Sequence, residues 1–215
     1  MIKMENDAVK IRYSKLADDA CCLSCGGALE KSGAVSGEVC IDLGSGRGTD
    51  VIRLAEIVGS QGFVYGIDVT PEMVNKGKSA ARKLGIRNAG FLLAELDKIP
   101  LNADLADLVI SNCVINHVRN KERVWAEIYR LLKTNGRFVI SDIYSVDPVP
   151  VKYSSDPVAV AECWAGAVTK NEYLAGVRQA GFQDIVILEE SKPYRKGEIE
   201  VCSFTLSGNK RKADQ

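Results

Sequence analysis

Apolar and polar residues alternate in blocks along residues 39–142, and the period of the pattern changes from block to block. Short apolar runs are typical of buried strands, whereas apolar residues three and four positions apart predict amphipathic helices. The predicted strands and helices are strands 39–43, 62–67, 89–93, 106–112 and 136–142, and helices 48–58, 71–84 and 120–133. Strands that alternate with helices favour a parallel sheet with helices on both faces.

After residue 142 the pattern is less regular. A long connection spans residues 143–168, and its Asp156-Pro157 pair predicts a short helix that carries Cys163 and Trp164. Connections of this length inside a compact domain are usually functional or disordered.

A capping box of Thr169 and Glu172 predicts the start of a helix that runs to Gly181. Two further strands, at about 183–190 and 198–207, are expected to pair as an antiparallel hairpin. The expected fold is therefore α/β: a Rossmann-like, doubly wound, mostly parallel sheet of seven strands that ends in an antiparallel C-terminal hairpin.

The length of the chain predicts one domain. Residues 1–38 combine an amphipathic stretch, three cysteines and a run of glycines and serines, which predict a mobile, cysteine-bearing lid. Residues 39–208 are the expected main domain, in which 143–168 is a substrate-binding insertion, and residues 209–215 are a charged tail.

The charge balance disfavours several classes of protein. The 28 basic residues equal the 28 acidic ones, so there is no electrostatic reason to expect nucleic acid as a partner. No signal peptide and no apolar run of about 18 residues is recognisable, so we expect a cytoplasmic protein without membrane contact. We also expect a monomer.

Seven cysteines and a single histidine constrain the chemistry. In a reducing compartment, cysteines are more often ligands, reactive thiols or small core residues than disulfides. Because His117 is the only histidine, Ser/His/Asp or Cys/His catalysis and a multi-histidine metal site are disfavoured. Cys40 and Cys202 are expected to be core residues.

A glycine-rich turn follows the first predicted strand. The sequence VCIDLGSGRG, residues 39–48, places three glycines where the backbone turns tightly before a helix and can approach a ligand. The spacing GxGxG is not the GxGxxG of dinucleotide folds, which disfavours a nicotinamide enzyme, and no phosphate loop is present. The second strand ends in Asp68, which is placed to bind both hydroxyls of a ribose. Together the two pieces resemble motifs I and II of class I S-adenosylmethionine (SAM) methyltransferases.

The resemblance implies that SAM binds in the crevice at the carboxyl ends of the strands. We expect the glycine turn to contact the methionine portion, Asp68 the ribose, and Glu95 with Leu96 the adenine. Asp42 is expected to order the turn by hydrogen bonding. Tyr13 lies where the family has a Tyr-Gly pair, with serine here in place of the glycine. The full set of expected cofactor contacts is Tyr13, Asp42, Gly44, Ser45, Gly46, Gly48, Asp68, Val69, Glu95, Leu96 and Asn112.

Two segments go beyond a general cofactor fold. They are SNCVINH at residues 111–117 and ECWAGA at residues 162–167. With the turn LGSGRG, the strand end GIDVTPEMV and the segment EYLAGVRQAGF, they resemble arsenite methyltransferases over roughly residues 38 to 187.

The resemblance implies that Cys113 and Cys163 bind trivalent arsenic, with a third thiolate from Cys22 or Cys25 of the lid and with Cys21 as a further candidate. Trivalent arsenic is soft and takes thiolate ligands. Its lone pair can attack a sulfonium methyl directly, so no general base is needed. Catalysis is then mostly positioning, and a thiol reductant is the expected second partner.

Two other interpretations stay open. In the first, a SAM methyltransferase acts on a small organic or quinone-like acceptor and uses the cysteines only structurally. In the second, a non-catalytic protein binds a metalloid or zinc, because Cys22-x-x-Cys25 is half of a zinc-site spacing. The other half of that spacing is absent from the sequence.

Overall fold

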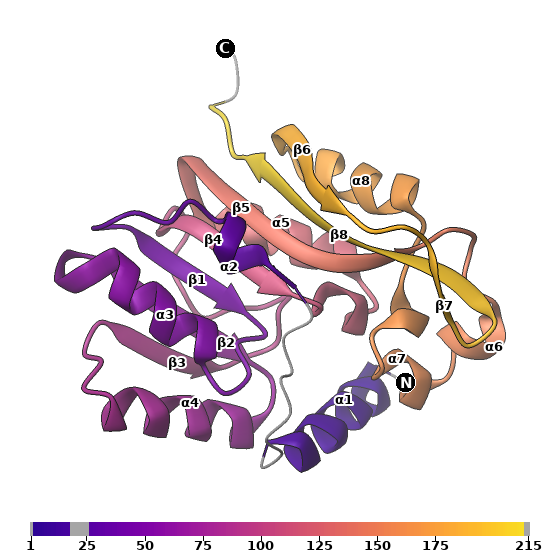
Figure 1. The fold of residues 1–215 in the computed structure, drawn as a ribbon, viewed down its shortest axis with the longest axis horizontal. Coiled ribbons are helices and arrows are strands. Elements are labelled where there is room, and N and C mark those ends of the chain that lie inside the picture. The colour runs from indigo at the N-terminus through magenta and orange to yellow at the C-terminus, as the bar shows by residue number, and fades with distance from the viewer. Residues whose placement is uncertain (1, 18–25, 213–215) are drawn as a thin grey trace.

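The computed structural model describes residues 2–17 and 26–212, which form one sheet with helices on both faces (Figure 1). The strands are β1 (Val39–Leu43), β2 (Phe63–Asp68), β3 (Ala89–Leu93), β4 (Ala106–Asn112), β5 (Leu132–Ser145), β6 (Gln183–Glu190), β7 (Tyr194–Lys196) and β8 (Ile199–Asn209). Their order is β3-β2-β1-β4-β5-β8-β6, with β7 paired to β8. Strands β1 to β5 are parallel, and β8 is antiparallel to its neighbours. The predicted fold class is confirmed.

The sheet separates the core into two layers, and helices cover each of them. The helices are α1 (Ile2–Leu16), α2 (Ala28–Lys31), α3 (Thr49–Val58), α4 (Pro71–Lys83), α5 (Lys121–Leu131), α6 (Val151–Ser154), α7 (Pro157–Val160) and α8 (Lys170–Gln179), with 3-10 turns η1 (Gly59–Gln61), η2 (Ile115–His117) and η3 (Trp164–Gly166). Helices α2, α3 and α4 pack on one face of the sheet, and α5 and α8 pack on the other. Cys40 and Cys202 are buried in these two layers, as expected for core residues.

Two local predictions were wrong. The short helix that begins after Asp156 ends at Val160, so it does not carry Cys163, which lies in a turn between α7 and η3. The sheet also has an eighth strand, β7, between the two predicted C-terminal strands, where no strand was predicted. It pairs with β8 through a two-residue connection at Gly197, whose positive φ of 59° is typical of such tight hairpins.

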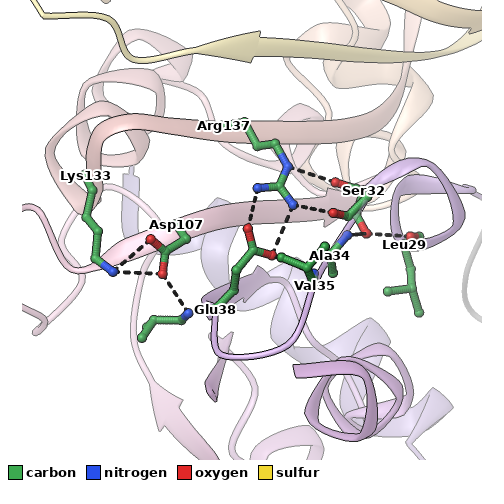
Figure 2. A network of polar contacts seen from close by, with 10 residues as sticks. Leu29, Ser32, Ala34, Val35, Glu38, Asp107, Lys133 and Arg137 are labelled. Atoms are coloured by element: carbon green, nitrogen blue, oxygen red, sulfur yellow. Dashed lines mark hydrogen bonds and ion pairs between the residues drawn. The ribbon is translucent and has the colours of Figure 1, made fainter. Parts of the chain in front are cut away.

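The segment before β1 is fastened to the sheet by charged side chains (Figure 2). Arg137 of β5 forms an ion pair of 2.6 Å with Glu38 and donates hydrogen bonds to the carbonyl oxygens of Ser32 and Gly33. Such a two-pronged guanidinium contact fixes geometry as well as charge. These contacts hold Ser32, Gly33 and Glu38 against β5, and the mobile lid over residues 1–38 stays a prediction.

Candidate active site

A cavity of about 950 Å³ lies at the carboxyl ends of β1, β2 and β4. This volume is within the range of small-molecule sites. Most residues expected to contact the cofactor line it, as does one of the two core thiols: Tyr13, Asp42, Gly44, Ser45, Gly46, Asp68, Val69, Glu95, Leu96, Asn112 and Cys113. Gly48 does not. It precedes α3 with a φ of 82°, and a Cβ there would lie 2.5 Å from the ring of Phe91, so Gly48 serves close packing of the helix.

The glycine turn is held by the acid at the end of β2. The backbone N–H of Gly46 donates to Asp68 Oδ2 at 2.9 Å, and that of Thr70 donates to Asp68 Oδ1 at 2.8 Å. Gly46 has a φ of 51° and no neighbouring atom within 4 Å of the position of a Cβ, so its backbone is open to a ligand. The backbone N–H groups of Gly44 and Ser45 donate to the carbonyl oxygen of Ile67, so β2 supplies these acceptors too, and the expected ordering of the turn by Asp42 stays a prediction.

Burial raises the pKa of several carboxyl groups around the cavity. The pKa of Asp42 lies well above its usual range because its carboxyl group is buried, with the nearby charges of Asp50 and Asp68 adding to the effect. Burial likewise raises the pKa of Asp68 and of Asp50, against the hydrogen bonds that each accepts. A positive charge nearby favours the ionised form of a buried carboxyl group, so these carboxyl groups suit a positively charged ligand.

Two predicted thiols meet at the end of β4. One ligand atom each of Cys113, Cys163 and Asp142 lies within 4.8 Å of the others. The Cys163 thiol donates to the carbonyl oxygen of Cys113 at 3.4 Å and to Asp142 Oδ1 at 3.8 Å. Cys113 lines the cavity, whereas Cys163, only 9% exposed, does not. A convergent pair of thiols can bind a soft metalloid or metal.

Both cysteines have a backbone conformation that non-glycine residues rarely adopt. Their φ angles are 55° for Cys113 and 75° for Cys163. Such a conformation costs about 1–3 kcal/mol per residue and clusters at functional sites. Both turns direct a thiol toward the same point, so this strain accompanies the geometry needed for binding.

The single histidine joins two segments that cover the site. His117 Nδ1 lies 3.0 Å from the carbonyl oxygen of Val160 in α7, to which it donates, and Nε2 accepts from the Tyr13 hydroxyl of α1 at 3.1 Å. Burial lowers the pKa of His117 to about 4, so the ring is neutral near pH 7. His117 therefore holds α1 against α7. The sequence shows where His117 lies but not these partners, which are distant along the chain.

Replacing His117 by leucine is expected to loosen α1. The variant removes both hydrogen bonds, each of which contributes about 0.5–1.5 kcal/mol, and Tyr13→Phe removes one of them. We expect amide hydrogen exchange in α1 to speed up several-fold in each variant. A double-mutant cycle measured by this exchange should show a coupling of about 1 kcal/mol between the two positions. Strictly additive effects would show that Tyr13 and His117 act independently.

Asn112 holds the chain where it returns from the lid. Its Oδ1 accepts a hydrogen bond from the backbone N–H of Ala28 at 3.2 Å, and its Nδ2 donates to Asp50 at 3.0 Å. Gly26 packs so tightly that a Cβ would overlap Asn112 and Ser141. The predicted lid ligands Cys22 and Cys25, with Cys21, lie outside the described residues.

Gly26→Ala is expected to lower the free energy of unfolding by about 1–3 kcal/mol, because the added methyl group overpacks this contact. Gly27→Ala is the matched control. Its Cβ would meet no atom closer than 3.9 Å, so a change below about 1 kcal/mol is expected. Urea unfolding of both variants measures the difference, and equal losses would show that Gly26 is not specifically packed.

One site residue was missed by sequence reasoning. Asp142 lies near the carboxyl end of β5, next to both thiols, and is 2% exposed. Burial raises its pKa to about 6. Its sequence signal was an acid at the end of a predicted strand, the same signal that identified Asp68.

The strand order, the glycine turn and the position of the cavity are those of the class I SAM-dependent methyltransferase fold. A family model described as "Methyltransferase domain" matches residues 34–181. Within residues 2–17 and 26–212, we find no helix with the length and apolar character needed to cross a membrane.

Two relatives indicate which methyltransferases this chain resembles in sequence. The chain is 38% identical over 165 residues to the arsenite methyltransferase of Halobacterium salinarum, and 34% identical over 180 residues to that of Mus musculus. These alignments cover 77% and 76% of this chain, and 42% and 47% of the relatives, so the chain spans less than half the length of either.

A solved structure agrees. The chain matches CrArsM, an arsenic (III) S-adenosylmethionine methyltransferase from Chlamydomonas reinhardtii, with a TM-score of 0.77 and 30% identity over 97% of this chain and 75% of that one. The chain belongs to the methyltransferase domain family and, within it, to the arsenite methyltransferases.

Proposed function

We propose that the chain transfers a methyl group from SAM to trivalent arsenic, either arsenite or methylarsenite, which is held by cysteine thiolates. The observation that carries the proposal is the convergence of Cys113 and Cys163 beside the cavity at the end of β4. The names of the matched relatives support the choice of arsenic as the acceptor.

The residues around the cavity fit SAM. Within residues 2–17 and 26–212, the buried hydroxyl of Ser45 has no hydrogen-bond partner, and Ser45 lines the cavity. Asp68 binds the ribose hydroxyls, the open backbone at Gly46 faces the methionine portion, and Glu95 with Leu96 contacts the adenine. When bound, SAM supplies a methyl group on a cationic sulfonium, and the buried acids around the cavity favour that charge.

No side chain of the site has to act as a general base. The lone pair of thiolate-bound arsenic is itself the nucleophile, and His117 has both ring nitrogens in hydrogen bonds. Cys113 and Cys163 bind and orient the arsenic, which replaces a bimolecular encounter by a fixed geometry. A small thiol reductant keeps the cysteines reduced, in agreement with a cytoplasmic setting.

The third thiolate comes from Cys22 or Cys25 of the lid. Gly26 directly follows Cys25 and packs against Asn112, which directly precedes Cys113. Gly26 thus lies against the residue that precedes Cys113, and this favours Cys25, its neighbour in sequence, over Cys22.

Incubation of the chain with SAM, a thiol reductant and either arsenite or a quinone-like acceptor tests this function. We expect methylated arsenic, detected by chromatography with mass spectrometry, above a control without protein. Methylation of the organic acceptor with no methylated arsenic would instead support a structural role for the cysteines. Arsenic binding without methyl transfer would support a binding protein.

A further inference from the structure

Asp142 is a buried acid at the thiol site that the proposed reaction does not use. One of its carboxylate oxygens belongs to the same cluster as the sulfur atoms of Cys113 and Cys163, within 4.8 Å. Trivalent arsenic has three ligands, so the third position of an arsenic atom held by these two thiolates lies within reach of the carboxylate.

Arsenic binding removes one of the hydrogen-bond donors to Asp142. Oδ1 accepts from the backbone N–H of Ile143 at 2.8 Å, from Asn116 Nδ2 at 2.9 Å and from the Cys163 thiol at 3.8 Å. Oδ2 accepts one long hydrogen bond, at 3.4 Å, from the Tyr173 hydroxyl. Formation of an arsenic–sulfur bond removes the thiol proton, and with it one donor to a buried carboxylate. Ile143, Asn116 and Tyr173 still donate to the carboxylate, and the position that the thiol proton leaves is open to another donor.

The chemistry of arsenite supplies a replacement donor. Arsenite in water is arsenous acid, with three hydroxyl groups. Each thiol that binds gives its proton to a departing hydroxide, so that an arsenic–sulfur bond forms, an arsenic–oxygen bond breaks and one water leaves, without change of oxidation state. After Cys113 and Cys163 have reacted, arsenite keeps one hydroxyl. A monoorganic arsenical, which has only two hydroxyls, keeps none.

We propose that Asp142 accepts a hydrogen bond from the hydroxyl that arsenite keeps when Cys113 and Cys163 hold it, and so favours arsenite over monoorganic arsenicals at this stage. The inference rests on the proposed function. A hydroxyl bonded to a carboxylate is a charge-assisted pair, whereas an organic substituent in the same place offers no hydrogen bond to replace that of the thiol. A third thiol from the lid can later displace the hydroxyl as water.

The test compares two ligands in two proteins. Arsenite and phenylarsine oxide, which is a monoorganic arsenical in water, are titrated into the parent chain and into Asp142→Asn, with a phosphine reductant. Binding is followed by tryptophan fluorescence, because Trp164 directly follows Cys163. The amide of asparagine preserves the size of the side chain but is only a neutral acceptor.

We expect Asp142→Asn to weaken arsenite binding about ten-fold, and phenylarsine oxide binding less than about three-fold. Tyr173→Phe is the matched control, because it removes the long hydrogen bond to Oδ2 and keeps the carboxylate. It should leave the preference for arsenite in place. Equal weakening of both ligands in Asp142→Asn would assign Asp142 a structural role and overturn the inference, as would unchanged arsenite binding. If the parent chain binds neither arsenical, the proposed function itself fails.

A second measurement does not depend on the folding of Asp142→Asn. In a variant with serine at Cys21, Cys22 and Cys25, X-ray absorption at the arsenic edge should show two sulfur neighbours and one oxygen for bound arsenite. It should show two sulfurs, one carbon and no oxygen for the phenyl compound. Arsenite bound without an oxygen neighbour would contradict the inference.

Discussion

Replacement of Cys113 or Cys163 by serine is expected to reduce the rate of arsenite methylation at least about 100-fold. Loss of a residue that only orients a metal ligand already costs about 10–100-fold in affinity or activity, and loss of the ligand itself should cost more. A serine hydroxyl is a hard, poorly acidic donor that does not replace a thiolate on a soft metalloid. SAM binding should stay within about three-fold of the parent, since neither sulfur is needed to hold the nucleoside. Initial rates and calorimetric titration with SAM measure the two quantities.

Cys202→Ala is the matched control for these variants. Cys202 lies in β8, where it is buried in the core, and it does not line the cavity. Its loss should lower the melting temperature without lowering the methylation rate below about half. If the Cys113 and Cys163 variants methylate arsenite as fast as the parent, the assignment of the arsenic site is wrong.

Asp68→Asn is expected to weaken SAM binding roughly 10–100-fold, the effect of losing hydrogen bonds to a charged acceptor. The carboxylate accepts from the backbone N–H groups of Gly46 in the glycine turn and of Thr70 before α4. An amide turns a donor toward one of them, so the turn itself is disturbed. The ribose hydroxyls lose a charged acceptor in the same change.

Glu56→Gln on the exposed side of α3 removes the same charge away from the cavity. Calorimetric titration with SAM should distinguish the two variants, with affinity near that of the parent for Glu56→Gln. An affinity of Asp68→Asn within two-fold of the parent would show that Asp68 does not bind the ribose.

The sequence predicts the fold best where local pattern decides the structure. Strands β3 and β4 have their predicted bounds, because each is a short apolar run between turns. The helix predicted to reach residue 133 ends at Leu131, because Leu132 already pairs with Ala106 of β4. That pairing is a tertiary contact, which periodicity along the chain does not contain.

The residues of the candidate site also differ in how well the sequence predicts them. Asp68 and Cys113 are predictable because the topology brings the carboxyl ends of parallel strands together. Asp142 ends a strand too, but its importance depends on contacts with Asn116 and Cys163 that only the folded chain forms. The same holds for the hydrogen bond between His117 and Tyr13, which joins residues 104 positions apart in the sequence.

A single-turnover experiment tests the central claim most directly, namely that this chain presents thiolate-bound arsenic to SAM. Protein in excess is mixed with arsenite and SAM that carries an isotopically labelled methyl group, and the products are separated after acid quench. We expect one labelled methyl group on arsenic for each SAM consumed, and none with Cys113→Ser or Cys163→Ser. Consumption of SAM without label on arsenic, or equal labelling by the serine variants, would contradict it.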